Sequence, residues 1–413
     1  MGIWGAEHVV RDDVEQSALS GVFRRSENAT SGGWGLVRID QRYARTSHAL
    51  HDGVIVGSSV NVGLRLDGPG MFPQHARFVV RPDGVYVERA ADKAALWVDG
   101  VCTMRMPVSN GCVVRMGDTL FVFVERDLSS RRGAIEDHGG LAFGPSQLQW
   151  ISRAVAYAQA RQSFVIDGEP GTGKSSLARL ALARGRIEED VVVDARDADV
   201  VRQVRSAIRR GAKSWLVYHL DALARPLQQQ LARQLRREPA ALLIATLGRS
   251  LESALDDSRI ASSIASIICA RRISVPSLTD RKDDLPAISQ NLMTQIGCSD
   301  LPLAAIEIIA RTRWANGIPE LRSVLIQAFG QAECDTDTSV RCLAKLAPRA
   351  ITGQPLDTCL ADADLAKSRL KKALEQADRT VASASRTLQM SRQTFYREAK
   401  RLHVDLSRAK AAS

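Results

Sequence analysis

The chain lacks the features that would assign it to a secreted, zinc-binding or membrane class. Its seven cysteines are scattered without a C-x-x-C pair, which argues against a disulfide or zinc framework and favours a reducing cytoplasm. No apolar run approaches the roughly 20 residues of a membrane span, so we expect no membrane partner. The start, MGIWGAEHVVRDDVEQ, lacks the basic-then-apolar order of a secretory signal. At 413 residues and 45% hydrophobic, the chain is long enough for two or three soluble domains.

Positive charge is unevenly distributed along the chain. The formal net charge is +10, and residues 366–413 alone carry 12 Lys and Arg against four Asp and Glu. Such a concentration favours a polyanionic partner, and a solvated basic tail is the alternative.

The most specific motif is the stretch GEPGTGKS at residues 168–175, which fits the phosphate-binding loop G-x-x-x-x-G-K-[ST]. An expected strand at 163–167 precedes it and an expected helix at 176–182 follows, as the motif requires. Backbone N–H groups of such a loop wrap a polyphosphate at a helix N-terminus. We therefore predict a site for ATP or ADP with Mg²⁺, in which Lys174 reaches the terminal phosphates and Ser175 holds the metal ion. The predicted loop residues are Gly168, Glu169, Pro170, Gly171, Thr172, Gly173, Lys174, Ser175 and Ser176.

Composition and periodicity divide the chain into segments. We expect a flexible lead-in at 1–34, an all-β sandwich at 35–126 with a hairpin turn at Pro82–Gly84, and a polar linker at 127–143. An α/β domain follows at 144–272, with parallel strands at 163–167, 191–194, 215–220 and 241–246. A helical lid at 273–347, a second linker at 348–365 and a helical end at 366–413 complete the expected fold, a multidomain chain.

The last segment has the layout of a helix-turn-helix. A short helix at 381–388 leads through a turn to a helix at 392–402, on which Phe395 and Ala399 face inward. The outward side would contact double-stranded DNA, since Arg and Gln read base edges and Thr, Tyr and Lys reach phosphates. A helical hairpin with a solvated basic face is the alternative. The predicted DNA-binding residues are Arg392, Gln393, Thr394, Tyr396, Arg397, Lys400 and Arg401.

Three segments together resemble bacterial enhancer-binding regulators that act with sigma-54. Residues 384–396, ASRTLQMSRQTFY, resemble the Fis-type helix-turn-helix that closes these proteins. Residues 275–286, VPSLTDRKDDLP, and 314–322, WANGIPELR, are similar to motifs of their AAA+ domain. The β segment resembles a forkhead-associated (FHA) domain, a fold that binds phosphothreonine peptides, in the pieces Val56-Gly57, His75-Ala76, 98–100 and Gly117-Asp118. The resemblance covers about 80 to 90% of the chain.

The sequence departs from this family at the positions that carry its ATPase chemistry. By resemblance Asp221 orders Mg²⁺, but Ala222 replaces the glutamate that polarises the attacking water, so we expect weak hydrolysis or none. His219, expected on the same strand face as Asp221, is an unfavoured substitute base. Pro319 stands where the family has a sensor arginine, with Arg322 one turn on as a partial substitute. The remaining departures are Leu247 at the first sensor and Ala261 and Ile267 near the finger arginines, flanked by Arg259 and Arg271.

Two family contacts with partners are also in doubt. Between Lys174 and Asp221 the sequence has room for a strand and a basic helix but not for the GAFTGA loop that grips sigma-54. In the FHA-like segment, Ser58 takes the place of the phosphate-gripping arginine, Phe72 that of a serine, and Ala94 and Leu96 lie near two further contact positions. Arg65 or Arg77 could supply a cation, but we favour a protein-interaction sandwich over a phosphothreonine reader.

We therefore expect a cytoplasmic, homo-oligomeric, DNA-binding regulator, a dimer or a ring, with a nucleotide-binding AAA+ module. Two alternatives stay open, namely an active AAA+ ATPase that remodels a transcription complex, and an adaptor that docks a phosphoprotein through its FHA-like domain. The sequence assigns no catalytic residue.

Overall fold

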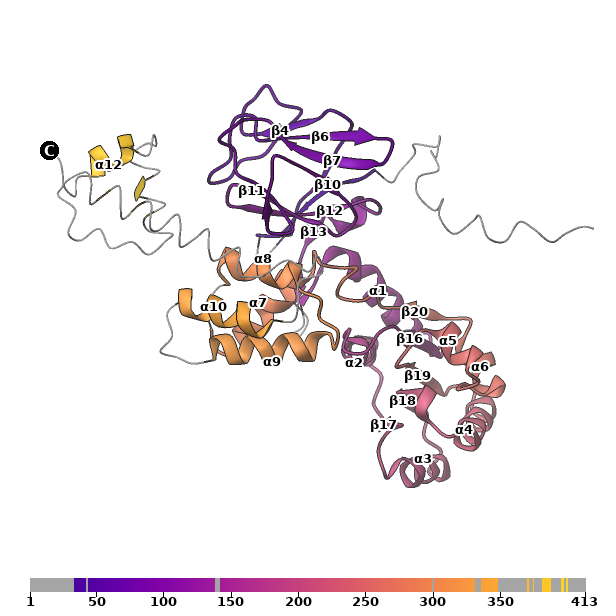
Figure 1. Ribbon diagram of the computed structural model, residues 1–413. Coiled ribbons are helices and arrows are strands. Elements are labelled where there is room, and N and C mark those ends of the chain that lie inside the picture. The colour runs from indigo at the N-terminus through magenta and orange to yellow at the C-terminus, as the bar shows by residue number, and fades with distance from the viewer. Residues whose placement is uncertain are drawn as a thin grey trace, which may run out of the picture.

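The structure, a computed structural model, describes residues 33–41, 44–137, 142–298, 301–330, 336–347 and 381–387, with single positions at 370, 374, 395, 396 and 399. Within these ranges the chain forms an N-terminal β-sandwich, a parallel α/β domain and a helical lid (Figure 1). No helix among them is long and apolar enough to cross a membrane.

Two sheets form the sandwich, and their strands pair antiparallel except β4 with β5. One has the strand order β3-β1-β12-β11-β8-β9 and the other β10-β7-β6-β4-β5. Phe78 and Phe123 stack across the core with ring centroids 6.5 Å apart, and Trp34 packs against both rings. The strands are β1 (Gly35–Arg38), β3 (Ser47–Ala49), β4 (Ile55–Gly57), β5 (Leu64–Arg65), β6 (Ala76–Arg81), β7 (Gly84–Arg89), β8 (Leu96–Val98), β9 (Val101–Cys102), β10 (Arg105–Val108), β11 (Val113–Met116) and β12 (Thr119–Val124).

The predicted hairpin turn is confirmed between β6 and β7. Arg81 pairs with Gly84 across a two-residue turn, and Gly84 has a φ of 145°, which an L side chain rarely adopts.

The segment at 127–143 differs from the polar linker that the sequence predicts. It holds a 3₁₀ turn at Ser129–Arg131, and β13 (Gly133–Ala134) pairs with β2 (Ala44–Arg45) of the sandwich. Next, β14 (Glu136–Asp137) pairs with β15 (Ala142–Phe143). Strands of two residues have no readable periodicity, so composition alone could not reveal this connection.

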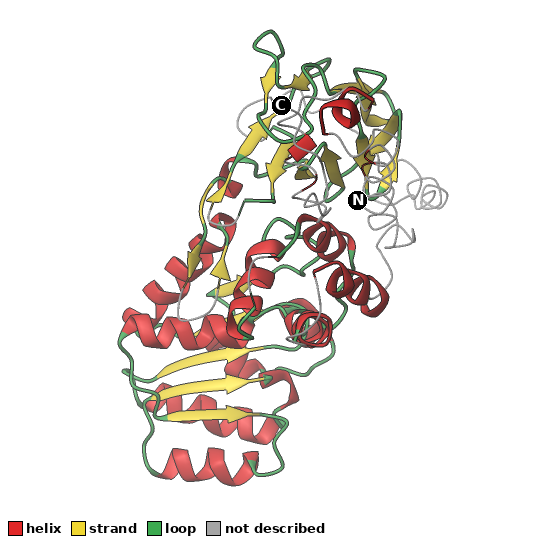
Figure 2. Ribbon diagram, turned by 90° about the vertical axis from the view of Figure 1, so that its left-hand side faces the viewer, coloured by secondary structure: helices red, strands yellow, loops and turns green. Residues whose placement is uncertain are grey.

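The α/β domain is a five-stranded parallel sheet in the order β17-β18-β19-β16-β20. Figure 2 shows its strands between helices on both faces. The strands are β16 (Phe164–Asp167), β17 (Val191–Asp194), β18 (Ser214–Tyr218), β19 (Leu242–Thr246) and β20 (Arg272–Ser274). The helices are α1 (Pro145–Gln159), α2 (Lys174–Gly185), α3 (Val200–Arg209), α4 (Arg225–Arg237), α5 (Leu251–Asp256) and α6 (Ser262–Ile268).

The two sheet faces have separate cores. Apolar residues of α1 and α2 pack on one face, and those of α3, α4, α5 and α6 pack on the other. Near-continuous apolar strands such as β18, buried at every position, are typical of a parallel sheet covered on both faces. The carboxyl ends of the strands therefore form one edge, at which both the phosphate-binding loop and Asp221 lie.

The lid is a small helical bundle beside the sandwich. It contains α7 (Leu285–Gln295), α8 (Leu303–Arg311), α9 (Ile318–Phe329) and α10 (Thr336–Leu346) around a core that includes Trp314 and Leu321. The fold class predicted from the sequence, a β-sandwich, a P-loop α/β domain and helices, is confirmed for the described ranges.

Little of the C-terminal segment is described. Helix α12 covers Val381–Thr387, Phe395 and Ala399 are helical and fully buried, and Tyr396 is 50% exposed. These burials agree with the inward and outward sides expected from the helical spacing. The other predicted DNA-binding positions lie outside the described residues, namely Arg392, Gln393, Thr394, Arg397, Lys400 and Arg401.

Candidate nucleotide site

The phosphate-binding loop links β16 to α2 at the carboxyl edge of the sheet. Gly171 and Gly173 have φ values of 71° and 95°, so both adopt a conformation that L side chains rarely take. A Cβ at Gly171 would stand 2.0 Å from the carbonyl oxygen of Asn316. The loop therefore needs glycine for its curvature and for its contact with the lid.

Lys174 begins α2 and points back into the loop. Its Nζ donates to the carbonyl oxygen of Gly168 at 2.9 Å and to that of Glu169. Burial lowers the pKa of Lys174 to about 8, although Asp167, Asp221 and Glu169 act in the opposite direction. The ammonium group thus stands over the loop, where an incoming phosphate would replace the two carbonyl partners.

The lid holds the loop from outside. Ile318 N donates to the carbonyl oxygen of Gly171 at 2.8 Å, and the buried guanidinium of Arg281 donates to the carbonyl oxygen of Thr172. Movement of the lid would therefore reach the loop directly through its backbone.

A cavity of about 490 Å³ opens beside the loop, between α1, α2, α7 and α9. Its volume and mostly apolar wall suit a planar heterocyclic base. Arg322 and Pro319 line it, as do the loop residues Thr172, Gly173 and Ser176. The main apolar lining residues are Phe143, Trp150, Ile151, Ile288, Leu292 and Ile326.

The remaining predicted loop residues are more open to solvent. Glu169, Pro170 and Ser175 are exposed, so the Ser175 hydroxyl is free to contact a solvent-borne ligand. Asp167, just before the loop, is buried and accepts from Arg272, from Ser274 Oγ at 2.8 Å and from Leu251 N at 2.7 Å. This network ties the loop to the start of α5.

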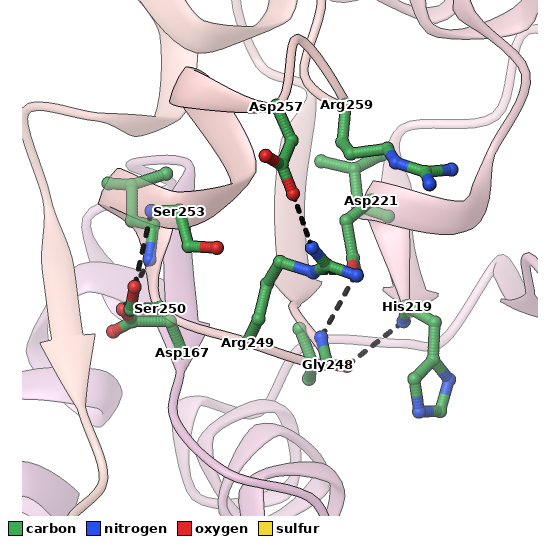
Figure 3. Close-up of polar contacts among 12 residues, drawn as sticks. Asp167, His219, Asp221, Gly248, Arg249, Ser250, Ser253, Asp257 and Arg259 are labelled. Atoms are coloured by element: carbon green, nitrogen blue, oxygen red, sulfur yellow. Dashed lines mark hydrogen bonds and ion pairs between the residues drawn. The ribbon is translucent and has the colours of Figure 1, made fainter.

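Asp221 lies in a 3₁₀ turn (Leu220–Ala222) after β18 and already has two partners. Its Oδ1 accepts from Gly248 N at 3.0 Å, and its Oδ2 stands 3.6 Å from Arg249 Nε. Arg249 also donates to Asp257 at 2.6 Å, and Figure 3 shows its guanidinium between the two carboxylates. An internal cation thus contacts the carboxylate that the sequence assigns to Mg²⁺.

The predicted position of His219 is wrong. Strand β18 ends at Tyr218, two residues earlier than expected, and His219 has a left-handed φ of 54° that turns the chain into the 3₁₀ turn. Its Nδ1 lies 3.1 Å from Asp194 Oδ1, and Figure 3 shows the imidazole pointing away from Asp221. His219 therefore offers no base at the Asp221 side of the site.

The other positions near the expected catalytic centre carry no suitable group. Ala222 is exposed and bears only a methyl group, Leu247 is buried, and the Arg259 guanidinium points away from Arg249 in Figure 3. Arg271 donates to Gln162 at 3.0 Å. It directly precedes β20 and so lies at the amino end of that strand, whereas the phosphate-binding loop lies at the carboxyl edge of the sheet.

The donor set suits a metal ion that arrives with a polyphosphate. Mg²⁺ in such sites takes few protein ligands and several phosphate and water oxygens. Ser175 offers an exposed hydroxyl, and Asp221 offers a carboxylate that is 11% exposed. Among the described residues no cluster of three or more His, Cys, Asp or Glu could hold a metal by itself.

Four consecutive buried residues, Arg281 to Asp284, join three parts of the molecule. Arg281 contacts the phosphate-binding loop, and Lys282 Nζ donates to the carbonyl oxygen of Gly111 in the sandwich at 2.6 Å. Asp283 accepts from Arg131 through its carboxylate, and its carbonyl oxygen accepts from Arg45 at 2.8 Å.

Asp284 completes this junction by accepting from Gln147 of α1. Burial, reinforced by the neighbouring Asp283, raises the pKa of Asp284. Beside it, Arg115 of β11 pairs with Glu307 of α8 at 3.1 Å. The sandwich is therefore attached to the lid and the nucleotide site through charged contacts.

His75, one of the positions of the FHA-like pattern, holds two loops of the sandwich together. His75 is fully buried, accepts from Phe72 N at 3.1 Å through Nδ1 and donates to the carbonyl oxygen of Ala95 at 2.9 Å through Nε2. Burial lowers its pKa, so the ring is neutral and braces two loops. Ser58 brings no cation to its position, and its hydroxyl donates to the carbonyl oxygen of Met71.

The two candidate cations of the sandwich lie on the strands that flank β4. Arg65 is opposite Gly57 and lies 3.4 Å from Asp67, and Arg77 is opposite Ile55 and exposed.

Part of the chain is similar in sequence to a known regulatory protein. No family model matches the chain. It is 29% identical over 167 residues to the Nif-specific regulatory protein of Azotobacter vinelandii, which covers 38% of this chain and 32% of that protein. The chain thus spans about a third of the length of the curated relative that it matches.

Two solved structures are also similar. NtrX from Brucella abortus, crystallised in complex with ADP, has 17% identity and a TM-score of 0.43, covering 65% of this chain and 69% of that one. A structure from a study of phosphothreonine-dependent FHA domain interactions has 16% identity and a TM-score of 0.21, covering 24% of this chain and 100% of that one.

Sequence reasoning missed several residues of the site. Trp150, Ile288 and Ile326 line the cavity but are ordinary apolar positions of helices, so no local signal distinguishes them. Arg249 could have been flagged, because it follows the buried β19 strand by three residues at the edge where Asp221 lies.

Proposed function

We propose that this chain is a DNA-binding transcriptional regulator whose AAA+ module binds ATP or ADP and hydrolyses ATP slowly or not at all. The observation that carries the proposal is the contrast within one site. The phosphate-binding loop and cavity are assembled for a nucleotide, while Asp221 is paired with Arg249 and followed by Ala222.

Nucleotide binding would use the loop for the phosphates and the cavity for the base. Lys174 would contact the terminal phosphates, Arg322 would face the nucleotide from α9, and Ser175 with Asp221 would hold Mg²⁺. The metal ion supplies charge neutralisation to the phosphates when bound. A crystallised complex with ADP in the similar NtrX supports the same ligand class.

Hydrolysis needs groups that none of the described residues places near Asp221. A general base must stand within hydrogen-bond reach of the attacking water, and Ala222 has no acceptor there. Pro319 brings no charge to the phosphates, and an arginine finger is typically worth 10³ to 10⁵ in rate. We therefore infer a nucleotide switch that controls conformation or homo-oligomer assembly.

The proposed switch has a physical route to the sandwich. Arg281 contacts the phosphate-binding loop, while Lys282 and Asp283 contact the sandwich and the segment that follows it. A shift of the loop would therefore move the contacts with the sandwich. The loops that His75 braces are the candidate surface for a protein partner. We propose protein recognition by these loops, without a requirement for phosphothreonine.

DNA binding is assigned to the C-terminal segment. Its net positive charge, the buried Phe395 and Ala399, and the exposed Tyr396 support a helix with a basic outward side. The name of the similar Nif-specific regulatory protein supports a regulatory role, which we place in the cytoplasm. Contact with sigma-54 through an inserted loop is not part of the proposal, since only β17 and α3 lie between α2 and β18, an interval that is described throughout.

The test uses the full chain with four substitutions in the basic helix. Genome-wide binding would first supply a DNA site, and fluorescence anisotropy would then compare wild type with the variant R392Q/R397Q/K400Q/R401Q. We expect affinity for the site to fall at least about 100-fold, because four phosphate or base contacts are lost. Unchanged affinity and unchanged salt dependence would refute the DNA-binding role of this segment.

An active ATPase is the second candidate, favoured by the completeness of the phosphate-binding loop. It predicts steady-state phosphate release near about 1 s⁻¹, abolished by Lys174→Ala.

A further inference from the structure

Two neighbouring helices of the α/β domain carry positively charged side chains and no acidic residue. Helices α3 and α4 lie side by side, at the end of the molecule away from the sandwich in Figure 1. Together they carry seven arginines and no Asp, Glu or Lys. These arginines, which we call the arginine face, are Arg202, Arg205, Arg209, Arg225, Arg233, Arg236 and Arg237.

The amphipathic pattern places these arginines outward. On α3 the buried residues Val200, Val204 and Ala207 face the sheet, and on α4 Leu227 and Leu231 do so. Every arginine of the face is exposed. On each of the two neighbouring helices the charge therefore lies on the side that faces solvent.

Most of the face is not neutralised within the chain. Arg202 pairs with Asp199 at 2.6 Å, while Arg225 and Arg236 donate to backbone or hydroxyl oxygens. Four arginines make no hydrogen bond or ion pair with any residue that the structure describes, namely Arg205, Arg209, Arg233 and Arg237. Clustered like charges repel one another, and a bound polyanion would relieve that repulsion.

The chemistry of the face matches a phosphate backbone. Guanidinium groups present planar forks that bind phosphate oxygens, and the neighbouring uncharged positions Gln203, Ser206 and Gln229 can add hydrogen bonds. Beside α3, a cleft of about 520 Å³ is lined by Arg202 and Arg210 and also by Asp190, whose carboxylate accepts from the backbone N–H groups of Lys213 and Ser214. An acidic protein is a poorer fit, because α4 exposes no large apolar side chain and α3 exposes only Val201, which is little to anchor a protein interface.

We propose that the arginine face binds the phosphate backbone of double-stranded DNA, as a second and sequence-independent contact beside the C-terminal segment. The inference rests on the proposed DNA-binding function. One chain would then hold its site through the C-terminal helix and the flanking duplex through α3 and α4. This contact would add affinity and salt dependence without adding sequence specificity.

The test measures the salt dependence of DNA binding by full-length protein. Binding to a 40-bp random-sequence duplex would be followed by anisotropy across a KCl series for the variant R205Q/R209Q/R233Q/R237Q. Since each lost phosphate contact removes about 0.9 from the slope of log K against log salt, we expect the magnitude of the slope to fall by up to about 3.6 when four contacts are lost. Affinity near 0.1 M KCl should fall at least about tenfold.

Two further full-length chains separate the possible failures. The variant R65Q/R77Q/R126Q/R132Q removes the same formal charge from exposed positions in and beside the sandwich, and we expect it to keep the wild-type slope within about 1. The variant R392Q/R397Q/K400Q/R401Q should lose preference for the specific site but keep the arginine-face contribution.

An arginine-face variant that folds, by circular dichroism and melting temperature, and keeps the wild-type slope would overturn the inference. That result would also be obtained if the face docked an acidic protein. A C-terminal variant that binds its specific site like wild type would instead overturn the proposed function, so the two failures are distinct.

Discussion

The two sides of the nucleotide site differ in how completely they are built. On the loop side, Lys174, the glycines and the cavity form a continuous surface that the lid holds in place. On the Asp221 side, the carboxylate is shared with Gly248 N and Arg249, and the next residue is Ala222. We therefore propose that holding a nucleotide and cleaving it depend on separate groups, and that among the described residues only the first set is complete.

The difference has a physical reason. A phosphate-binding loop works mainly through backbone N–H groups and one ammonium group, which the fold itself positions. Hydrolysis needs a base and compensating cations placed within fractions of an ångström. A single substitution such as alanine at 222 would remove the second property and leave the first.

The largest effect is expected from Lys174→Ala, which removes the ammonium group of the phosphate-binding loop. We expect nucleotide affinity to fall 100- to 1000-fold, about 3–4 kcal/mol, because two charge-assisted phosphate contacts are removed. Calorimetry with ADP would measure it. Lys213→Ala, an exposed lysine before β18, is the matched control and should bind like wild type.

The second prediction concerns the stability of the junction at Arg281 to Asp284, behind the phosphate-binding loop. Asp283 is fully buried and pairs with Arg131, so Asp283→Asn leaves a mostly buried guanidinium without its counter-charge. We expect the free energy of unfolding of the junction to fall by about 2–3 kcal/mol, below the cost at a fully buried pair because Arg131 is 15% exposed. Urea unfolding followed by tryptophan fluorescence would measure it, and an unchanged midpoint would contradict the assigned role of the pair.

The third prediction concerns pH. In the free protein Lys174 is charged below its pKa of about 8 and neutral above it. Bound phosphates favour the charged form, so binding above pH 8 requires proton uptake, and affinity should fall by about tenfold per pH unit as pH rises from 8. Calorimetry in two buffers of different ionisation enthalpy would detect the proton, and Lys174→Ala should abolish the pH dependence.

The fourth prediction concerns the Asp221 side. Arg249→Ala frees the Asp221 carboxylate, so Mg²⁺ should strengthen ATP binding about fivefold more than in wild type, in line with about 1 kcal/mol for a partly exposed pair. Titration of a fluorescent ATP analogue with and without Mg²⁺ would show this. Arg259→Ala is the matched control, since its guanidinium points away in Figure 3, and an equal effect of both substitutions would refute a specific role of Arg249.

The smallest effect is expected from restoring the missing carboxylate. Ala222→Glu should raise ATP turnover less than about threefold, because Arg249 still contacts Asp221 and Pro319 still replaces a cation. Steady-state phosphate release would measure it. A large revival of turnover by this single change would mean that the rest of the site is competent.

The sequence predicted what depends on local pattern. The loop motif, the apolar strands and the hairpin at Pro82–Gly84 are each specified by neighbouring residues, and the structure has them within one or two positions. The end of β18 was missed because His219 adopts a left-handed φ, which histidine takes more often than most residues but still too rarely to be predicted from its type.

Features that join distant segments were beyond the sequence. The similarity of residues 275–286 to a family motif gave no sign that Arg281, Lys282 and Asp283 each contact a different partner. The contact between Arg249 and Asp221 likewise depends on two loops brought together only at the sheet edge. Such contacts follow from tertiary packing, which periodicity does not encode.

The most direct test of the central claim follows ATP on the wild-type protein. ATP affinity and single-turnover hydrolysis of γ-labelled ATP would be measured in one preparation with Mg²⁺. The account predicts micromolar binding with ATP remaining intact on the protein for many minutes, a rate below about 10⁻³ s⁻¹. Hydrolysis near about 1 s⁻¹, lost in Lys174→Ala, would contradict it.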